Sequence, residues 1–238
     1  AINNGDTPIT LSSDITLTDL GKIAFGANTI VKSQTGSQFT ITLEGTSRFE
    51  VSNGKTVKFQ NLNIVFAENS EIVSNPWNDG DKITVGNSSG AATLYIENCT
   101  VENKATDIGT SDNAVILSYQ NQPSNIYINN STVKSAATNG NGCLVFGGDS
   151  NATFYITNST MQAKDTSAWF CNSGAVLVLI GTTTTRGWIH SSAKSYDLTN
   201  ATVKAARNKD NLIELTKIGS GSAVNSATYK IYYSTDAA

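Results

Sequence analysis

A short pattern of alternating apolar and polar residues recurs in the middle of the chain. Three copies, which begin at Leu94, Ile126 and Phe154, share Tyr, Ile, Asn and Thr at equivalent positions. Alternation with a period of two is typical of a β-strand with one face in a core. The interval between copies shortens along the chain, as expected when stacked strands are kept and their connecting loops vary. The pattern therefore predicts a β-solenoid, an all-β stack of coils.

Further segments extend the repeat toward both ends of the chain. Weaker copies lie at 23–30, 41–48, 57–64, 177–184 and 196–203. Short apolar runs, typical of strands buried on both faces, lie at 83–85, 114–117, 143–146, 168–171 and 212–215. Each coil is therefore expected to contain at least two strands. Residues 1–238 are expected to form one solenoid domain, with an N-terminal cap at about 1–20 and a C-terminal capping strand at about 223–238.

The alternation also predicts which residues face the core. Leu94 and Ile96 are expected to point inward, with Tyr95 on the outer face. The same alternation places Asn98 inside, at the end of the strand, and Cys99 outside. The resulting inward column of stacked amides is expected to consist of Asn98, Asn130, Asn158 and Asn200. Because a buried amide cannot carry a glycan, the Asn-x-Ser/Thr sequences at these positions are not expected to be glycosylated. A parallel threonine column is expected at Thr100, Thr132, Thr160, Thr183 and Thr202.

Composition and charge narrow the range of partners. Only 15% of residues are charged, against about 25% in an average soluble domain, and Asn, Thr, Ser and Gly fill the polar positions. A net charge of −3 without a basic cluster argues against a nucleic-acid partner. No apolar run reaches the roughly 18 residues of a membrane span. The first residues lack a secretion signal, so we expect a removed signal or a start within a longer protein.

The stacked strands, the asparagine at the bend and the coils of variable length resemble the right-handed parallel β-helix of the pectate-lyase-like superfamily. The opening segment from Ile2 to Leu11 is similar to the first strand of bacterial surface proteins of this class, which resemble adhesins. The likeness covers residues from about 10 to 220. It implies a right-handed parallel β-helix, and it makes the extracellular space or the cell surface the expected location.

Enzymes of this superfamily degrade polysaccharides, using either calcium held by clustered carboxylates with a Lys or Arg base, or a group of aspartates in a cleft. The sequence offers neither set, so no catalytic residue is assigned. Calcium needs six to eight oxygen ligands, and the densest acidic loop supplies only Asp79 and Asp81, in a sequence that is also typical of a simple turn. No cofactor is expected, and a calcium ion at this loop is the alternative. Three cysteines, Cys99, Cys143 and Cys171, lack zinc-site spacing and are expected to be small, buried or half-buried thiols.

Aromatic residues are the candidates for carbohydrate binding. Tyr95, Tyr127 and Tyr155 are expected to place several rings in one plane on adjacent coils, where sugars could stack; the alternative is that the rings only stabilise the sheet. Trp77 and Trp188 are further candidates. The leading hypothesis is a non-catalytic extracellular surface or adhesion module that binds a glycan or a host surface. The alternatives are a polysaccharide lyase or glycoside hydrolase of the β-helix class, and a structural spacer or fibre segment.

Overall fold

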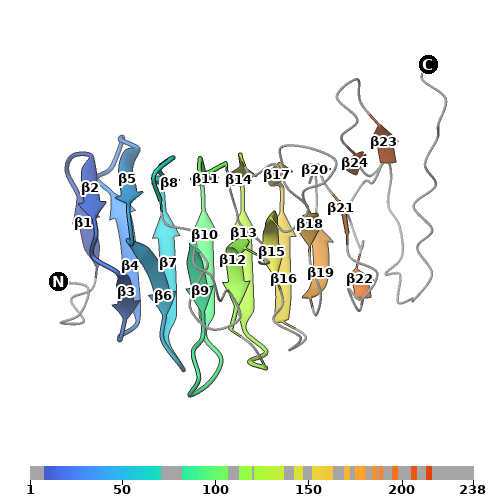
Figure 1. The fold of residues 1–238 in the computed structure, drawn as a ribbon, viewed down its shortest axis with the longest axis horizontal. Coiled ribbons are helices and arrows are strands. Elements are labelled where there is room, and N and C mark those ends of the chain that lie inside the picture. Colours follow the sequence, from blue (N-terminus) through green and yellow to red (C-terminus); the bar gives the residue numbers. More distant parts are fainter. Residues whose placement is uncertain are drawn as a thin grey trace.

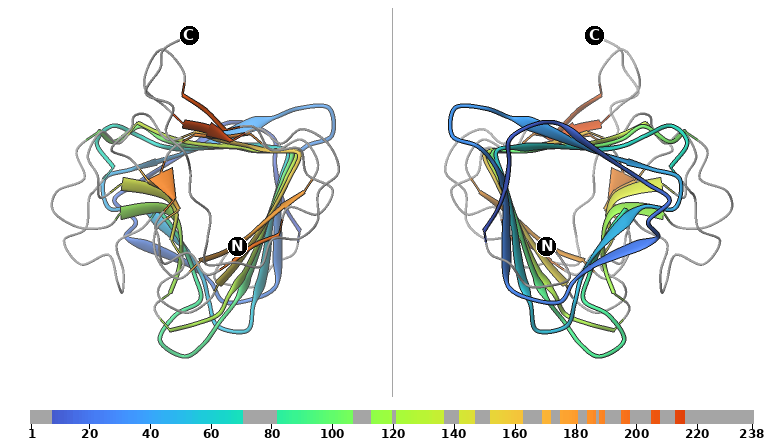
Figure 2. Two further views of the ribbon diagram at one scale, coloured as in Figure 1. Left: turned by 90° about the vertical axis from the view of Figure 1, so that its right-hand side faces the viewer. Right: turned by 90° about the vertical axis from the view of Figure 1, so that its left-hand side faces the viewer.

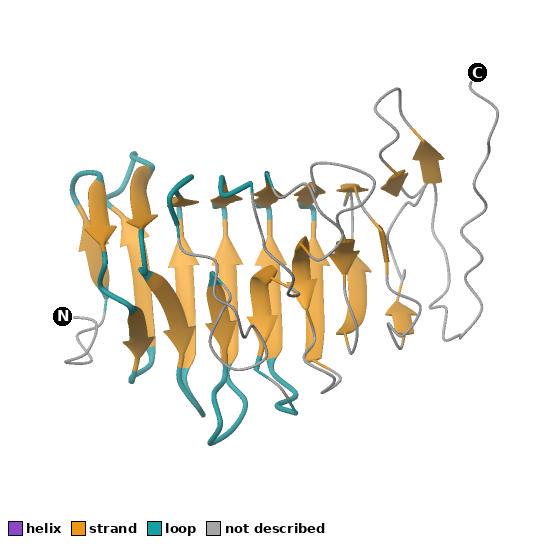
Figure 3. Ribbon diagram, in the orientation of Figure 1, coloured by secondary structure: helices purple, strands orange, loops and turns teal. Residues whose placement is uncertain are grey.

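The computed structural model describes residues 8–70, 82–106, 113–119, 121–136, 142–146 and 152–162, and short strands between residues 169 and 215. All regular structure within these residues is β (Figure 3). No helix of the described part is therefore long and apolar enough to cross a membrane. The prediction of an all-β chain is confirmed for this part of the chain.

The strands form three sheets that run along the length of the molecule (Figure 1). Sheet A consists of β1 (Ile9–Leu11), β4 (Thr29–Ser33), β7 (Thr56–Gln60), β10 (Thr93–Glu97), β13 (Asn125–Asn129), β16 (Ala152–Thr157), β19 (Ala175–Ile180) and β22 (Ser195–Asp197). Sheet B consists of β2 (Ile15–Thr18), β5 (Phe39–Glu44), β8 (Leu62–Phe66), β11 (Thr100–Asn103), β14 (Thr132–Ser135), β17 (Thr160–Gln162), β20 (Thr184–Arg186), β24 (Ile213–Leu215) and β23 (Ala205–Arg207). Sheet C consists of β3 (Lys22–Phe25), β6 (Arg48–Val51), β9 (Ile83–Val85), β12 (Asn113–Ser118), β15 (Gly142–Phe146), β18 (Trp169–Cys171) and β21 (Trp188–Ile189).

The chain passes through sheets A, B and C in this order, once in each coil, from β1 to β22. Seen along the stack, the three sheets outline a triangle (Figure 2). Neighbouring strands pair in parallel, except that β24 pairs antiparallel with β20 and β23. This arrangement is that of a β-solenoid with three strands in each coil, one more than the minimum expected from the sequence.

The predicted second strands belong mainly to sheet C. The runs at 83–85, 114–117, 143–146 and 168–171 correspond to β9, β12, β15 and β18, whereas the run at 212–215 corresponds to β24 of sheet B. The weak copies at 23–30 and 41–48 are out of phase with the others, because they begin in sheets C and B instead of sheet A. The first coil begins with β1, inside the segment predicted as a cap, and the predicted capping strand at 223–238 lies outside the described residues.

The repeated segment bends at its asparagine and forms two strands, not one. Asn98 separates β10 from β11 and has a φ of 52°, in the left-handed region that asparagine tolerates better than most residues. The bend resets the alternation, so Asn98 is exposed while Cys99 is buried with 3% of its surface exposed. Asn130 and Asn158 are also exposed, at φ of 47° and 46°.

The prediction of an inward asparagine column is therefore wrong for Asn98, Asn130 and Asn158, and Asn200 lies outside the described residues. The column lies on the outer corner between sheets A and B, and it includes Asn61, which also has a positive φ. Because Asn98, Asn130 and Asn158 are exposed, burial does not exclude glycosylation at these positions. Local alternation could not reveal the bend, because the left-handed conformation adds a turn that a period of two does not contain.

The residue after each asparagine takes the inner place at this corner. The backbone N–H of Ser131 donates to the hydroxyl of Ser159 on the next coil at 3.1 Å, and the thiol of Cys99 donates to the carbonyl of Glu97 at 3.2 Å. Buried polar groups are thereby satisfied at a point where the ladder hydrogen bonds are interrupted. The prediction of a buried thiol is confirmed for Cys99; the side chains of Cys143 and Cys171 lie outside the described part.

The inward residues of all three sheets meet in one apolar core. Leu94 and Ile96 have no exposed surface, as the alternation predicted. Phe25, Phe49 and Phe59, one from each of three strands, pack together with ring centroids 5.4–5.7 Å apart. Because the core consists of stacked equivalent positions, the outward residues between them are also brought into straight columns, and these columns form the molecular surface.

Candidate functional site

Tyr95, Tyr127 and Tyr155 form one column on the outer face of sheet A, as predicted from the repeat. Their strands pair in register, and the three side chains are half-buried. The ring centroids of neighbouring tyrosines are 4.6 Å apart, with interplanar angles of 8° and 6°. The rings are therefore stacked face to face along the solenoid axis. The prediction that they share one plane is wrong, because equivalent rotamers on stacked strands place the rings parallel to one another.

This stacking removes both ring faces of Tyr127 as a platform for sugars. Both faces of Tyr127 are covered by its two neighbours, which leaves only ring edges and hydroxyls for a ligand. The Nζ atom of Lys58 lies 5.3 Å from the centroid of the Tyr95 ring and is 2.9 Å from Oε1 of Glu97. Burial raises the pKa of the Tyr127 phenol, and the neighbouring Tyr155 and Tyr95 raise it further. The geometry thus resembles a stabilising stack more than a binding platform.

For the other predicted site residues, either the whole residue or its side chain lies outside the described part of the structure. Trp77, Asp79 and Asp81 lie outside the described residues. Trp188 belongs to β21, where it is the partner of Trp169 next to an irregularity in the strand register, and its side chain is not described. Within the part of the chain that the structure describes, no group of three or more His, Cys, Asp or Glu side chains could hold a metal ion.

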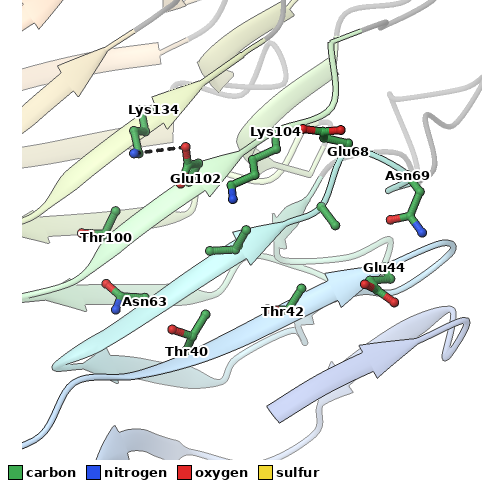
Figure 4. Close-up of a pocket in the computed structure, with 12 residues that line it drawn as sticks. Thr40, Thr42, Glu44, Asn63, Glu68, Asn69, Thr100, Glu102, Lys104 and Lys134 are labelled. Atoms are coloured by element: carbon green, nitrogen blue, oxygen red, sulfur yellow. Dashed lines mark ion pairs between the residues drawn. The ribbon is translucent and has the colours of Figure 1, made fainter. Parts of the chain in front are cut away.

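A groove of about 820 Å³ lies on the outer face of sheet B (Figure 4). We refer to it as the sheet B groove. Its lining residues are Thr40, Thr42, Glu44, Asn63, Val65, Ala67, Glu68, Asn69, Thr100, Glu102, Lys104 and Lys134. They come from β5, β8, β11 and β14 and from the turns that follow β8 and β11. The groove therefore crosses neighbouring coils instead of lying within one.

The strand register explains why hydroxyl and amide groups gather in the groove. Thr40 pairs with Asn63, and Asn63 pairs with Thr100, so the three form one column. The residues that follow them on the strands, Ile41, Ile64 and Val101, are buried in the core. Alternation then directs the column outward, and Figure 4 shows the three side chains on the same face of the sheet.

Charged residues flank this column at the strand ends. Glu102 and Lys134 pair across β11 and β14, with 3.1 Å between Nζ and Oε1. The hydroxyl of Thr18 donates to the carboxylate of Glu44 at 2.9 Å. The turn after β8 is closed by a hydrogen bond from the N–H of Ser70 to the carbonyl of Ala67, at 2.9 Å, and it contributes Glu68 and Asn69 to the rim. Chemically, the groove offers many donors and acceptors and both signs of charge.

The sheet B groove was not predicted from the sequence. Each strand shows outward polar residues, but such residues are also typical of any solvated sheet face. The distinguishing feature of the groove is the column of Thr40, Asn63 and Thr100, which lie on three successive coils. The strand register that aligns them depends on the lengths of the loops between the coils. The one available signal was the threonine column. Thr100, Thr132 and Thr160 do pair in register, and the next partner is Thr184 instead of the predicted Thr183.

Comparison of the chain with protein-family models, with curated proteins and with solved structures finds no match in any of the three. Function is therefore inferred from the fold and from the outer faces of sheets A and B.

Proposed function

We propose that this protein is a non-catalytic, extracellular surface module that binds a carbohydrate in the sheet B groove. The observation that carries the proposal is the groove itself, which has about 820 Å³ of space lined by residues with hydroxyl, amide, carboxylate and amine groups together with Val65 and Ala67. A polyhydroxylated ligand satisfies such groups with hydrogen bonds, whereas an apolar ligand would leave them unpaired. This proposal moves the glycan site from the tyrosine column to sheet B.

We also propose that the solenoid is right-handed and related in architecture to the pectate-lyase-like β-helices. Connections between parallel strands of one sheet are right-handed in about 98% of cases, and each coil here connects parallel neighbours in sheets A, B and C. An adhesin-like role on a cell surface follows from the same resemblance and is part of the proposal.

A second candidate function is that of a structural spacer. The stacked Tyr95, Tyr127 and Tyr155 rings support it, because face-to-face stacking on a sheet strengthens contacts between neighbouring coils. The enzyme alternative would require that the protein cleaves a polysaccharide and forms products. The three functions therefore differ in two measurable properties, glycan binding and product formation.

The experiment is a glycan-binding screen on the native protein, combined with an assay for reducing ends and unsaturated products. We expect binding to at least one glycan without products. Asn63→Val should weaken that binding at least tenfold, because it removes the amide at the centre of the groove while Val suits a strand. Asn125→Val is the matched control, since Asn125 is an outward, half-buried strand asparagine on sheet A.

The possible results separate the candidates. Absence of binding to every glycan in the screen, without product formation, would leave the structural spacer as the remaining candidate. Product formation would identify an enzyme. Equal binding by the native protein and Asn63→Val would remove the groove as the site.

A further inference from the structure

The column that lines the groove continues beyond it. Thr40, Asn63, Thr100, Thr132 and Thr160 occupy equivalent positions on β5, β8, β11, β14 and β17 and pair in register from one coil to the next. All five side chains are half-buried. We call these five residues the hydroxyl track, although Asn63 contributes an amide. Only the first three line the groove, so Thr132 and Thr160 extend the same chemistry along the solenoid axis.

The spacing of the track is set by the coils. Adjacent strands of a sheet lie about 4.8 Å apart, and the tyrosine rings, which lie on three of the same coils, repeat every 4.6 Å. One sugar of an extended, linear polysaccharide advances the chain by a similar length. A chain lying along the axis can therefore present one hydroxyl group to each coil. A chain lying along a strand would instead meet one member of the track and then the charged strand end.

The charges beside the track favour an uncharged polymer. The groove is lined by three carboxylates, of Glu44, Glu68 and Glu102, and by two amines, of Lys104 and Lys134. Glu102 and Lys134 neutralise each other in an ion pair. A polymer with one charge on every sugar would meet a like charge somewhere along this surface, and such juxtaposition is unfavourable.

We propose that the hydroxyl track binds a neutral, linear polysaccharide along the solenoid axis, with one sugar on each coil. This inference rests on the proposed function and specifies its ligand class and the direction in which the ligand lies. It also assigns Thr132 and Thr160, which lie outside the groove, to the binding surface.

The test measures calorimetric affinities of the native protein for cello-oligosaccharides and fully N-acetylated chito-oligosaccharides of two to six sugars, both of which are uncharged. Affinity should rise roughly fivefold with each sugar, the equivalent of about one net hydrogen bond, and should level off at five sugars because the track has five members. Oligogalacturonates of the same lengths, which carry a charge on each sugar, should bind more weakly.

Two variants test whether the ligand contacts the part of the track that lies outside the groove. Thr160→Val should reduce the affinity for the five-sugar oligomer about fivefold and leave the two-sugar oligomer unchanged, because a short ligand can occupy other coils. Thr153→Val is the matched control, because Thr153 is an outward, half-buried threonine on a strand of sheet A. It should change neither affinity. Melting temperatures of both variants establish that the fold is retained.

The results distinguish failure of this inference from failure of the proposed function. Affinity that stops rising at three sugars and is unaffected by Thr160→Val would confine the ligand to the groove and overturn the track. Stronger binding of the acidic oligomers would overturn the neutral ligand class. Both outcomes would leave glycan binding intact, whereas absence of binding to any glycan would overturn both proposals.

Discussion

The backbone N–H of Cys99 donates a hydrogen bond to the hydroxyl of Ser131, one coil further along, at 3.0 Å. The same hydroxyl donates to the carbonyl of Asn129 at 2.7 Å. Both residues lie on the inner side of the corner where the chain leaves sheet A for sheet B, and both are buried. The hydroxyl therefore fills a gap in the backbone hydrogen bonds between two coils. These bonds continue on either side of it, from the N–H of Asn98 to the carbonyl of Asn129 at 3.0 Å and from the N–H of Thr132 to the carbonyl of Cys99 at 2.9 Å.

Ser131→Ala should lower the free energy of unfolding by roughly 1–3 kcal/mol, because the buried N–H of Cys99 loses its acceptor. Urea unfolding measures this change from the transition midpoint and slope. Ser131→Cys is the conservative variant, since Cys99 occupies the equivalent position on the preceding coil, and it should cost less. A loss below about 0.5 kcal/mol for Ser131→Ala, typical of a surface change, would contradict the bridging role.

Asn130→Ala should destabilise the protein by roughly 1 kcal/mol, because alanine adopts the left-handed conformation less readily than asparagine. Asn130→Gly should cost little, since glycine occupies this region freely. Asn129→Ala is the control for loss of an amide, because Asn129 is the preceding residue and has the extended backbone of a strand. If Ala and Gly at position 130 had equal effects in urea unfolding, the side chain would matter more than the backbone conformation.

Tyr127→Ala should lower the free energy of unfolding by roughly 1–3 kcal/mol, since each of its two stacked contacts contributes about 0.5–1.5 kcal/mol. Tyr127→Phe keeps the stack and should be close to the native protein. Neither variant should change glycan affinity, because the proposed binding site lies on sheet B. Loss of binding in a stably folded Tyr127→Ala protein would return the binding site to sheet A.

Stability should decrease as the pH rises above about 9. Burial raises the pKa of the Cys99 thiol from 9.0 to about 11, so the folded protein holds this proton more tightly than the unfolded chain. The stabilising contribution is complete below pH 9 and is lost between pH 9 and 11. Its size is roughly 1–3 kcal/mol, since one pKa unit corresponds to about 1.4 kcal/mol.

Urea unfolding of the native protein and of Cys99→Ala across this pH range measures the contribution. The variant should be less stable at neutral pH and should lose less stability than the native protein between pH 9 and 11. Parallel pH profiles for the two proteins would show that the thiol is not the titrating group. The raised pKa of the Tyr127 phenol acts in the same direction at higher pH, and Tyr127→Phe removes that effect.

The sequence was sufficient for the class of fold and for much of the core. Leu94, Ile96 and Tyr95 lie on the faces that the alternation predicted, because the period of two is a local property of an extended backbone. The column of Tyr95, Tyr127 and Tyr155 was also predictable, since identical spacing within the repeat implies equivalent places on successive coils. These features depend on residues that are neighbours in one strand, or on the repetition of such a strand.

Only the tertiary structure decided where the strands end, how the tyrosine rings are oriented and where a groove lies. The left-handed backbone at Asn98 reverses the faces that follow it, so Asn98 is exposed and Cys99 is buried, and nothing in the apolar pattern shows this reversal. The groove depends on Thr40, Asn63 and Thr100 meeting across three coils. Their register is set by the loops and by core packing between coils, and both act over distances in the chain that a local pattern does not cover.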